Sequence, residues 1–259
     1  MSDSEPSTTN PGTDTTQSDL EAPYNLTEAE LSHFHSHAWA QSVLKSSLQD
    51  GQGEYVAMRT PSRTMKQATG EDGFFGQTLQ TPSTVPFFLT LQRRDIASVT
   101  ASLPQDPPVL DPTAKKSFTP SRPPDTITLV SLGSPGVSGH PSTAHGGLVA
   151  TLFDEIQSIV MTIHLPSPSS AEGGEDWAIR NKVFTAQLNV RYKAPVLVPG
   201  LLVVRGWCVA RHGRKTWTIA QALQEEEADG QGHLEWTKRK TVRAEASALW
   251  INVAEQPKL

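Results

Sequence analysis

The chain has 259 residues, a net charge of −5 and a single cysteine, Cys208. This length can hold one large domain or two small ones and can bury a full core. The acidic balance gives no bulk attraction to nucleic acid or to anionic membranes, and no apolar run approaches the roughly 18 residues of a membrane span. One cysteine excludes an internal disulfide and a multi-cysteine zinc site, and fits a reducing compartment. Cys208 lies in an apolar, strand-like stretch, which predicts that its side chain is buried in the core.

The first part of the chain divides into a tail and a helix. Residues 1–22 are rich in Ser, Thr and Pro, are acidic and contain no Lys or Arg, which is typical of a disordered tail and not of a secretory or mitochondrial signal. Thr27, followed by acidic residues, predicts a helix N-cap and a helix that runs to about Leu48. Three alternating histidines of this helix point in different directions, so they are not expected to bind a metal; they are His33, His35 and His37.

Residues 51–124 form a mixed region. Turn-rich pieces alternate with short apolar runs at 87–89 and 96–99, which can add an edge strand or line a binding site. The proline-dense stretch 104–124 predicts an extended linker. The alternating, β-branched pattern of residues 126–132 then predicts a strand. We therefore divide the chain into a tail (1–22), a helix with an irregular extension (23–125) and a main domain (126–253).

The stretch from Gly139 to Glu155 indicates a glycine-marked turn that opens into a helix, because apolar residues then recur at a spacing of three to four. These residues are Leu148, Leu152, Ile156, Ile159, Val160 and Ile163. The first helical turn falls at Gly146 and Gly147, where unpaired N–H groups and the helix dipole favour an oxyanion. Asp154 follows two turns later among apolar positions, where a buried carboxylate is costly. A solvent-facing Asp beside Glu155 is the alternative interpretation.

Four strand-like stretches follow the helix, at 183–193, 201–211, 215–225 and 234–250. Pro199-Gly200 and His212-Gly213 mark the first two turns, and the acidic stretch 225–233 marks the third. The Pro/Ser/Gly stretch 166–175 is either a lid or a solvated insertion. One helix followed by an antiparallel meander predicts an α+β fold.

Three motifs together carry a family resemblance. They are His145-Gly146-Gly147 with Asp154 nine residues after the histidine, the stretch 184–195 (FTAQLNVRYKAP), and Gly213-Arg214-Lys215. The combination closely resembles the hotdog-fold acyl-CoA thioesterases of the PaaI type, over roughly residues 126 to 251. The resemblance implies an α+β hotdog fold, in which an antiparallel sheet wraps around a central helix, here with an N-terminal helical extension. It implies no metal and no organic cofactor.

The resemblance also assigns roles to individual residues. Asp154 would be the general base or the nucleophile, and the Gly147 N–H would donate to the oxyanion within the substrate-binding turn that includes Gly146. His145 would help to bind or polarise the thioester carbonyl. Thr185 would orient the attacking water. Activated water and a donor to the developing oxyanion are what thioester hydrolysis requires.

Four basic residues fall where the family contacts coenzyme A, whose phosphates are recognised by Arg and Lys; they are Arg191, Lys193, Arg214 and Lys215. The family's site lies at a dimer interface, which implies a homodimer or a dimer of dimers with Asp154 and His145 acting from different subunits. We expect a cytoplasmic protein. Pro257-Lys258-Leu259 resembles a degenerate peroxisomal address and gives the alternative location.

Two other functions remain open at this point. A dehydratase or hydratase can use the same fold, but its usual Asp/His motif is not found here. A catalytically silent acyl-CoA-binding or sensor protein is the other alternative. The presence of Asp154, Thr185 and His145 together favours an acyl-CoA thioesterase, because binding alone needs no buried carboxylate. The sequence leaves open which acyl chain is used and whether residues 50–125 line its pocket.

Overall fold

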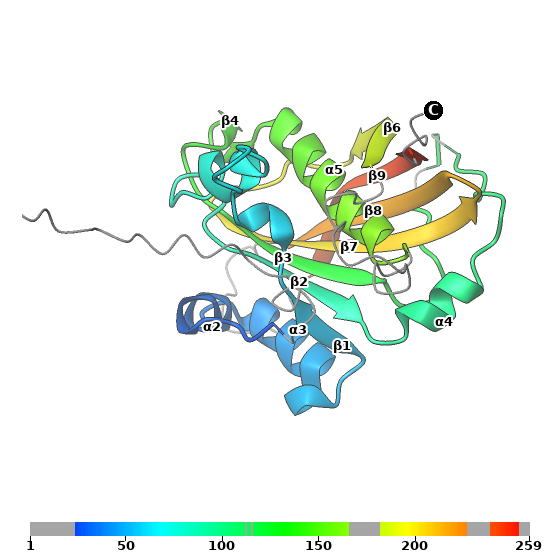
Figure 1. Ribbon diagram of the computed structural model, residues 1–259. Helices are drawn as coiled ribbons and strands as arrows, with labels where there is room; N and C mark the ends of the chain where they lie inside the picture. The colour runs from blue at the N-terminus through cyan, green and yellow to red at the C-terminus, as the bar shows by residue number, and fades with distance from the viewer. Residues whose placement is uncertain (1–23, 112, 115, 166–181, 227–238, 254–259) are drawn as a thin grey trace, which may run out of the picture.

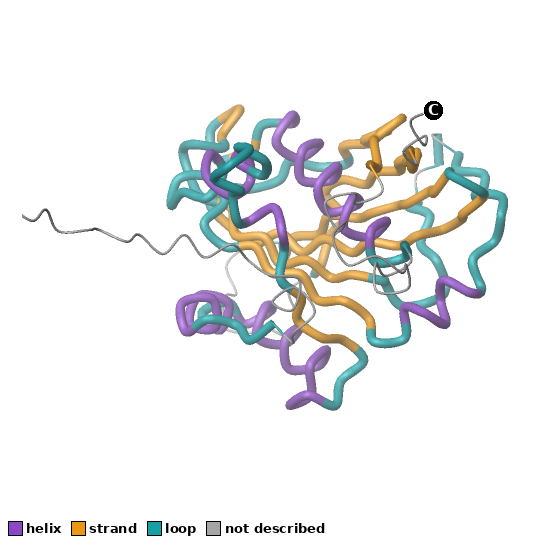
Figure 2. Tube along the Cα trace, in the orientation of Figure 1, coloured by secondary structure: helices purple, strands orange, loops and turns teal. Residues whose placement is uncertain are grey.

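The computed structural model describes residues 24–111, 113–114, 116–165, 182–226 and 239–253. Within them a seven-stranded antiparallel sheet carries the long helix α5 (Gly146–Thr162) on one face (Figures 1 and 2). The strands, in their order across the sheet, are β1 (Tyr55–Met58), β2 (Phe88–Arg93), β3 (Thr126–Leu132), β7 (Gly200–His212), β8 (Lys215–Glu225), β9 (Lys240–Val253) and β6 (Lys182–Tyr192). Two short strands, β4 (Ser138–His140) and β5 (Thr143–Ala144), pair separately just before α5.

The path of the chain through the sheet identifies the fold. The chain leaves β3, forms α5, and then adds β6 at the far edge of the sheet before β7, β8 and β9 fill the space between β3 and β6. A sheet that wraps around one helix in this way is the hotdog fold. The α+β hotdog prediction is therefore confirmed, and β1 and β2 extend the sheet beyond β3.

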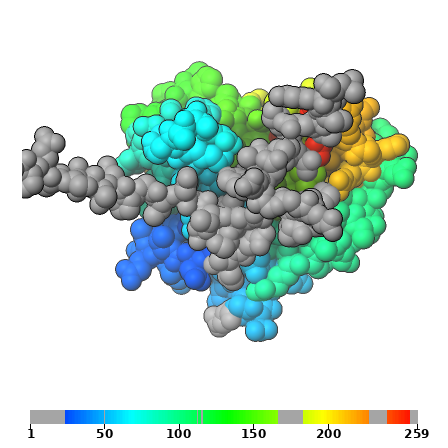
Figure 3. All heavy atoms as spheres, viewed as in Figure 1, coloured from blue at the N-terminus to red at the C-terminus, as the bar shows by residue number. Residues whose placement is uncertain are grey.

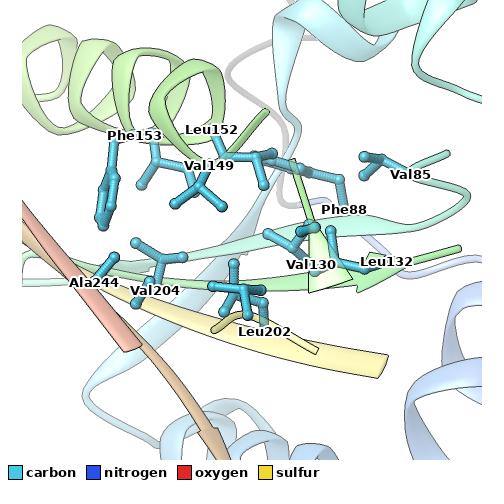
Figure 4. Close-up of a cluster of buried hydrophobic side chains, with 14 of the residues drawn as sticks. Val85, Phe88, Val130, Leu132, Val149, Leu152, Phe153, Leu202, Val204 and Ala244 are labelled. Atoms are coloured by element: carbon cyan, nitrogen blue, oxygen red, sulfur yellow. The ribbon is translucent and has the colours of Figure 1, made fainter. Parts of the chain in front are cut away.

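The central helix is held by an apolar interface with the concave face of the sheet (Figure 4). Val149, Leu152, Phe153 and Ile156 of α5 are each at most 2 % exposed, and burying a side chain of this kind contributes about 1.5–3 kcal/mol. Gly206 on β7 permits the close approach, because a Cβ there would lie 2.4 Å from Val160 Cγ2. The periodicity thus predicted the helix and the burial of Leu152, Ile156, Ile159 and Val160, but it did not include Val149 and Phe153.

The opposite face of the sheet is covered by the N-terminal helices α2 (Glu28–His35) and α3 (Ala38–Leu48) (Figure 1). Thr27 forms the predicted N-cap, but the prediction of one continuous helix is wrong, because His37 is extended at φ −104° and ψ 113°. On one helix Phe34 and Trp39 would point about 140° apart. The break lets both bury against the sheet, at 0 % and 9 % exposure.

The remaining sequence predictions have mixed outcomes. The prediction that residues 51–124 can add an edge strand is confirmed by β1 and β2, whereas the apolar run 96–99 lies in a short helix, α4 (Ile96–Ala101). The described residues of the 104–124 stretch form no helix or strand, and two of its backbone carbonyls accept hydrogen bonds from Trp207 and Gln221 of the sheet. Cys208 is fully buried, as predicted. The predicted tail at 1–22, the loop at 166–175 and the start of the last strand at 234–238 lie outside the described residues. No helix in the described part of the chain is long and apolar enough to cross a membrane.

A buried polar cluster joins the extension to the end of α5. Asp125 is fully buried and accepts hydrogen bonds from His164 Nε2 at 3.0 Å, from the Cys208 N–H at 2.7 Å and from Arg122. Thr100 Oγ1 contacts the other ring nitrogen of His164 at 2.6 Å. Burial alone would raise the pKa of Asp125, but the hydrogen bonds from His164, Arg122 and Cys208 and the positive charge of Arg122 lower it.

We expect Asp125→Asn to destabilise the protein by about 3 kcal/mol or more, because it breaks a buried ion pair and leaves donors unmatched. A carboxylate whose pKa is lowered by folding stabilises the protein above its unfolded pKa of about 4, and this contribution is lost as pH falls through the folded pKa. Urea unfolding at pH 7 and pH 3 measures both effects, with the exposed Asp106→Asn as control. An equal loss of unfolding free energy in Asp125→Asn and Asp106→Asn would contradict the stabilising role of the buried Asp125 carboxylate.

Candidate active site

The start of α5 is formed by the His145-Gly146-Gly147 turn. His145 is the N-cap, with extended backbone angles, and its Nδ1 accepts a hydrogen bond from the Gly147 N–H at 3.0 Å. Because Nδ1 is the acceptor, the neutral ring carries its proton on Nε2. The side chain of His145 is exposed. Its Nε2–H is therefore available to donate to a group that arrives from solvent.

This cap changes what was expected of the turn at Gly146 and Gly147, which we call the oxyanion turn. The sequence predicts a Gly147 N–H that is open to a ligand, whereas the structure pairs that N–H with His145. A side chain that bends back to cap its own helix leaves no periodic signal, so the sequence could not reveal it. For the Gly147 N–H to bind an oxyanion, a ligand oxygen must displace His145 Nδ1.

Asp154 and Thr185 are brought together from elements far apart in the sequence. Thr185 lies on β6 and donates its hydroxyl hydrogen to Asp154 Oδ1 at 2.8 Å. Asp154 lies on α5 and is half-buried. One carboxylate oxygen is thus fixed by Thr185, which orients the other. The role of Thr185 in orienting a water stays a prediction.

A second contact joins β6 to the start of α5. Tyr192 Oη donates to the Gly146 carbonyl oxygen at 2.7 Å. The same strand therefore contacts the helix at Asp154 and at Gly146, which fixes the strand along the helix. Sequence reasoning assigned Tyr192 no role of its own, because a tyrosine in a strand is expected from β propensity alone.

Two of the basic residues expected at coenzyme A make contacts within the protein. Arg191 pairs with Glu245 of β9, with 3.3 Å between Nη1 and Oε1. Lys193 donates to Ser117 Oγ at 2.8 Å and lies 3.8 Å from Glu245. Because side chains alternate along a strand, Arg191 lies on the face opposite Val190, which packs in the core below α5. Contact of either residue with coenzyme A stays a prediction.

The other two basic residues are exposed where β7 turns into β8, Arg214 in the turn and Lys215 as the first residue of β8. Arg214 and Lys215 lie at the same end of the sheet as Thr185, because Trp250 of β9 is paired with Thr185 on one side and with Thr216 on the other. They are thus placed nearer than Arg191 to the Thr185 end of β6. Their contact with coenzyme A also stays a prediction.

A hollow of about 660 Å³ opens beside Asp154. Its floor is α5, one wall includes Leu188 of β6, and another wall comes from residues 61–78, which we call the 61–78 segment. This segment contains two short helices, η2 (Pro61–Arg63) and η3 (Phe74–Thr78), and lies against α5 (Figures 1 and 3). Part of the 50–125 region therefore does line the hollow. The sequence left this open because the region carries no recognisable motif.

Glu155 is a second carboxyl group at this hollow. It accepts a hydrogen bond from Ser62 of the 61–78 segment. Burial, with the negative charges of Asp72 and Asp154, raises the pKa of Glu155, although the Ser62 hydroxyl and the charge of Arg63 oppose the shift. The sequence gave Glu155 no role except that of a neighbour, because its partners are about 80 to 90 residues away.

We expect Glu155→Gln to stabilise the protein at neutral pH, because the amide oxygen can still accept from Ser62 while the cost of a buried charge is removed. A carboxyl whose pKa is raised by folding loses stability as pH rises from its unfolded to its folded pKa. The gain over wild type should therefore grow between pH 4 and pH 7.5 in urea unfolding. A gain that is the same at both pH values would contradict the burial of a charged Glu155.

Comparison with known proteins finds a family model that matches the residues of this site. The model of the thioesterase superfamily matches residues 142–229, a range that contains His145, Asp154 and Thr185 but not the 61–78 segment. A search of the curated proteins found no match. Within the described residues no group of three or more His, Cys, Asp or Glu side chains could hold a metal ion.

Solved structures with detectable similarity include the following three proteins. A thioesterase superfamily protein is 25 % identical, with 49 % of this chain and 50 % of that chain covered and a TM-score of 0.32. A Streptococcus mutans protein bound to acetyl CoA is 16 % identical (51 % and 82 % covered, TM-score 0.36). A hexameric hotdog fold thioesterase of Campylobacter jejuni is 14 % identical (46 % and 77 % covered, TM-score 0.33).

The chain thus spans half the length of the first of these proteins. The family model and the observed topology agree independently of them. Residues 142–229 carry the match to the thioesterase superfamily, and the chain has the hotdog fold.

Proposed function

We propose that the protein is an acyl-CoA thioesterase, which hydrolyses an acyl-CoA to a free carboxylic acid and coenzyme A. The observation that carries this proposal is the hydrogen bond from Thr185 to Asp154, which fixes a carboxylate at a hollow open to a ligand. The superfamily match over the same residues supports it. A binding module would gain nothing from a half-buried carboxylate held in this way, because its desolvation is unfavourable.

The proposed reaction starts with a water molecule that gives its proton to the free oxygen of Asp154 as it attacks the thioester carbon. The carbonyl oxygen becomes negative and accepts hydrogen bonds at the start of α5, from His145 Nε2 and, once it displaces His145 Nδ1, from the Gly147 N–H. The tetrahedral intermediate then collapses and the carbon–sulfur bond breaks. The proton held by Asp154 passes to the leaving thiolate, which gives the acid and the free thiol. Direct attack by the Asp154 carboxylate, with later hydrolysis of the anhydride, is the alternative route.

The spacing of these groups along α5 supports a site that is shared by two copies of the chain. Gly147 and Asp154 are seven residues apart on one helix, about 10 Å along its axis. One thioester group must lie about 3 Å from both its base and its oxyanion donor. A single α5 therefore cannot supply both to one substrate. We propose that the oxyanion turn of one protomer acts with Asp154 of the other.

The free edge of β6 is the surface that we assign to this dimer. β6 is an end strand of the described sheet, and most of its residues from Phe184 to Tyr192 are exposed. An eleven-residue edge with unpaired backbone groups is a template for pairing with another strand. Antiparallel pairing of two β6 strands about a two-fold axis would run the two α5 helices in opposite directions, so that the start of one approaches Asp154 of the other.

We expect Asp154→Asn to lower kcat/KM by about a hundredfold or more, since a general base contributes at least that factor. Thr185→Val, which removes the donor to Asp154, should lower it less, and Thr185→Ser, which keeps the hydroxyl, should stay close to wild type. Thiol release from acetyl-, medium-chain, long-chain and aromatic acyl-CoAs gives the rates. Full activity of Asp154→Asn would remove Asp154 from the mechanism.

The same panel separates the other functions. A wild-type protein that binds acyl-CoA but releases no thiol would be a binding or sensor protein. A protein that hydrates an enoyl-CoA without breaking the thioester would be a hydratase on the same fold.

The cytoplasm is the proposed location and the peroxisome is the alternative.

A further inference from the structure

The 61–78 segment is firmly anchored to the domain although it lies outside the matched family region. The Arg63 guanidinium donates to the carbonyl oxygens of Phe75, Val85 and Pro86 at 2.8–3.2 Å. Phe75 is 6 % exposed and packs in the central core. Gly76 allows η3 to pack closely on η2 and the residues after it, because a Cβ there would lie 3.1 Å from the Ser62 carbonyl oxygen and 2.7 Å from the Met65 backbone nitrogen. Hydrogen bonds and core packing thus fix the segment as one wall of the hollow.

Phe74 is the exposed member of this wall. Its side chain is 53 % exposed, whereas the adjacent Phe75 is buried, and the two rings meet edge to face at 5.5 Å. Phe74 lines the hollow that also contains Asp154 and Leu188. An apolar side chain that is left open at a hollow beside a candidate catalytic group is a typical ligand contact.

The lining limits which acyl group fits. Its large apolar side chains are Phe74, Phe75 and Leu188, while Asp72, Asp154 and Glu155 bring three carboxyl groups to the same space. A long alkyl chain would have to desolvate these carboxyl groups, which costs free energy. A carboxylated acyl group would be repelled by Asp154 and Glu155, while the charge of Asp72 is paired with Lys66 at 3.1 Å. A short, uncharged acyl group can contact the apolar side chains without either cost.

We propose that Phe74 sets the length limit of the acyl group, and that the substrates are acyl-CoAs with short, uncharged acyl groups. This inference rests on the proposed thioesterase activity. It assigns selectivity to a segment of the chain that the thioesterase superfamily model does not match.

The test compares kcat/KM for butyryl-, octanoyl-, dodecanoyl- and succinyl-CoA in the full chain. Wild type should prefer butyryl-CoA over both dodecanoyl- and succinyl-CoA. Phe74→Ala should raise the dodecanoyl/butyryl ratio by about tenfold, the scale on which apolar pockets discriminate chain length. Phe74→Trp should lower the ratio. Phe118→Ala is the matched control, because Phe118 is 46 % exposed in the 104–124 stretch on the other side of the sheet.

Each outcome decides between the two proposals. An active wild type whose ratio is changed no more by Phe74→Ala and Phe74→Trp than by Phe118→Ala would overturn the role of Phe74 and leave the thioesterase activity standing. A wild-type preference for dodecanoyl- or succinyl-CoA would overturn the substrate class. A wild type that hydrolyses none of the acyl-CoAs would overturn both proposals. Circular dichroism checks folding, and the Trp variant alone decides if the Ala variant is unfolded.

Discussion

The hydrogen bond between Thr185 and Asp154 is the contact on which the rest of the site depends. Asp154 belongs to a helix whose neighbouring positions Leu152, Phe153 and Ile156 are packed against the sheet, so the backbone that carries the carboxylate is held in place. Thr185 reaches it because β6 crosses to the far edge of the sheet directly after the helix. The hotdog topology therefore brings the donor to the carboxylate, and the core holds both in place.

The same topology explains why the site opens at an edge. β6 supplies Thr185 and Tyr192 to α5 while its other side has no strand partner in the described sheet. Asp154 and Gly147 are about 10 Å apart along one helix, so the proposed chemistry would draw on a second helix. An edge strand beside the site is the simplest place for it. The 61–78 segment forms another side of the hollow, and the hydrogen bond from Ser62 to Glu155 joins this segment to α5.

Local pattern predicted much of this fold, and contacts between distant residues account for what it missed. The apolar spacing of α5, its start at Gly146 and the strand at 126–132 are short-range signals, and all agree with the structure. The break at His37 follows from burying Phe34 and Trp39 on one sheet face, which no local pattern records. The motif predicted that Asp154 and Thr185 act together, but not the cap by His145 or the Ser62 contact of Glu155. Those depend on side-chain direction and on partners far along the chain.

In the proposed dimer, one thioester is held between the oxyanion turn of one protomer and Asp154 of its partner. Mixing two inactive variants, His145→Ala and Asp154→Asn, under conditions that exchange subunits tests it directly. If the site spans two chains, half of the dimers carry one intact site, and activity should return to about a quarter of wild type. If both groups act within one chain, every site in the mixture lacks one of them. A mixture no more active than its components would contradict the account.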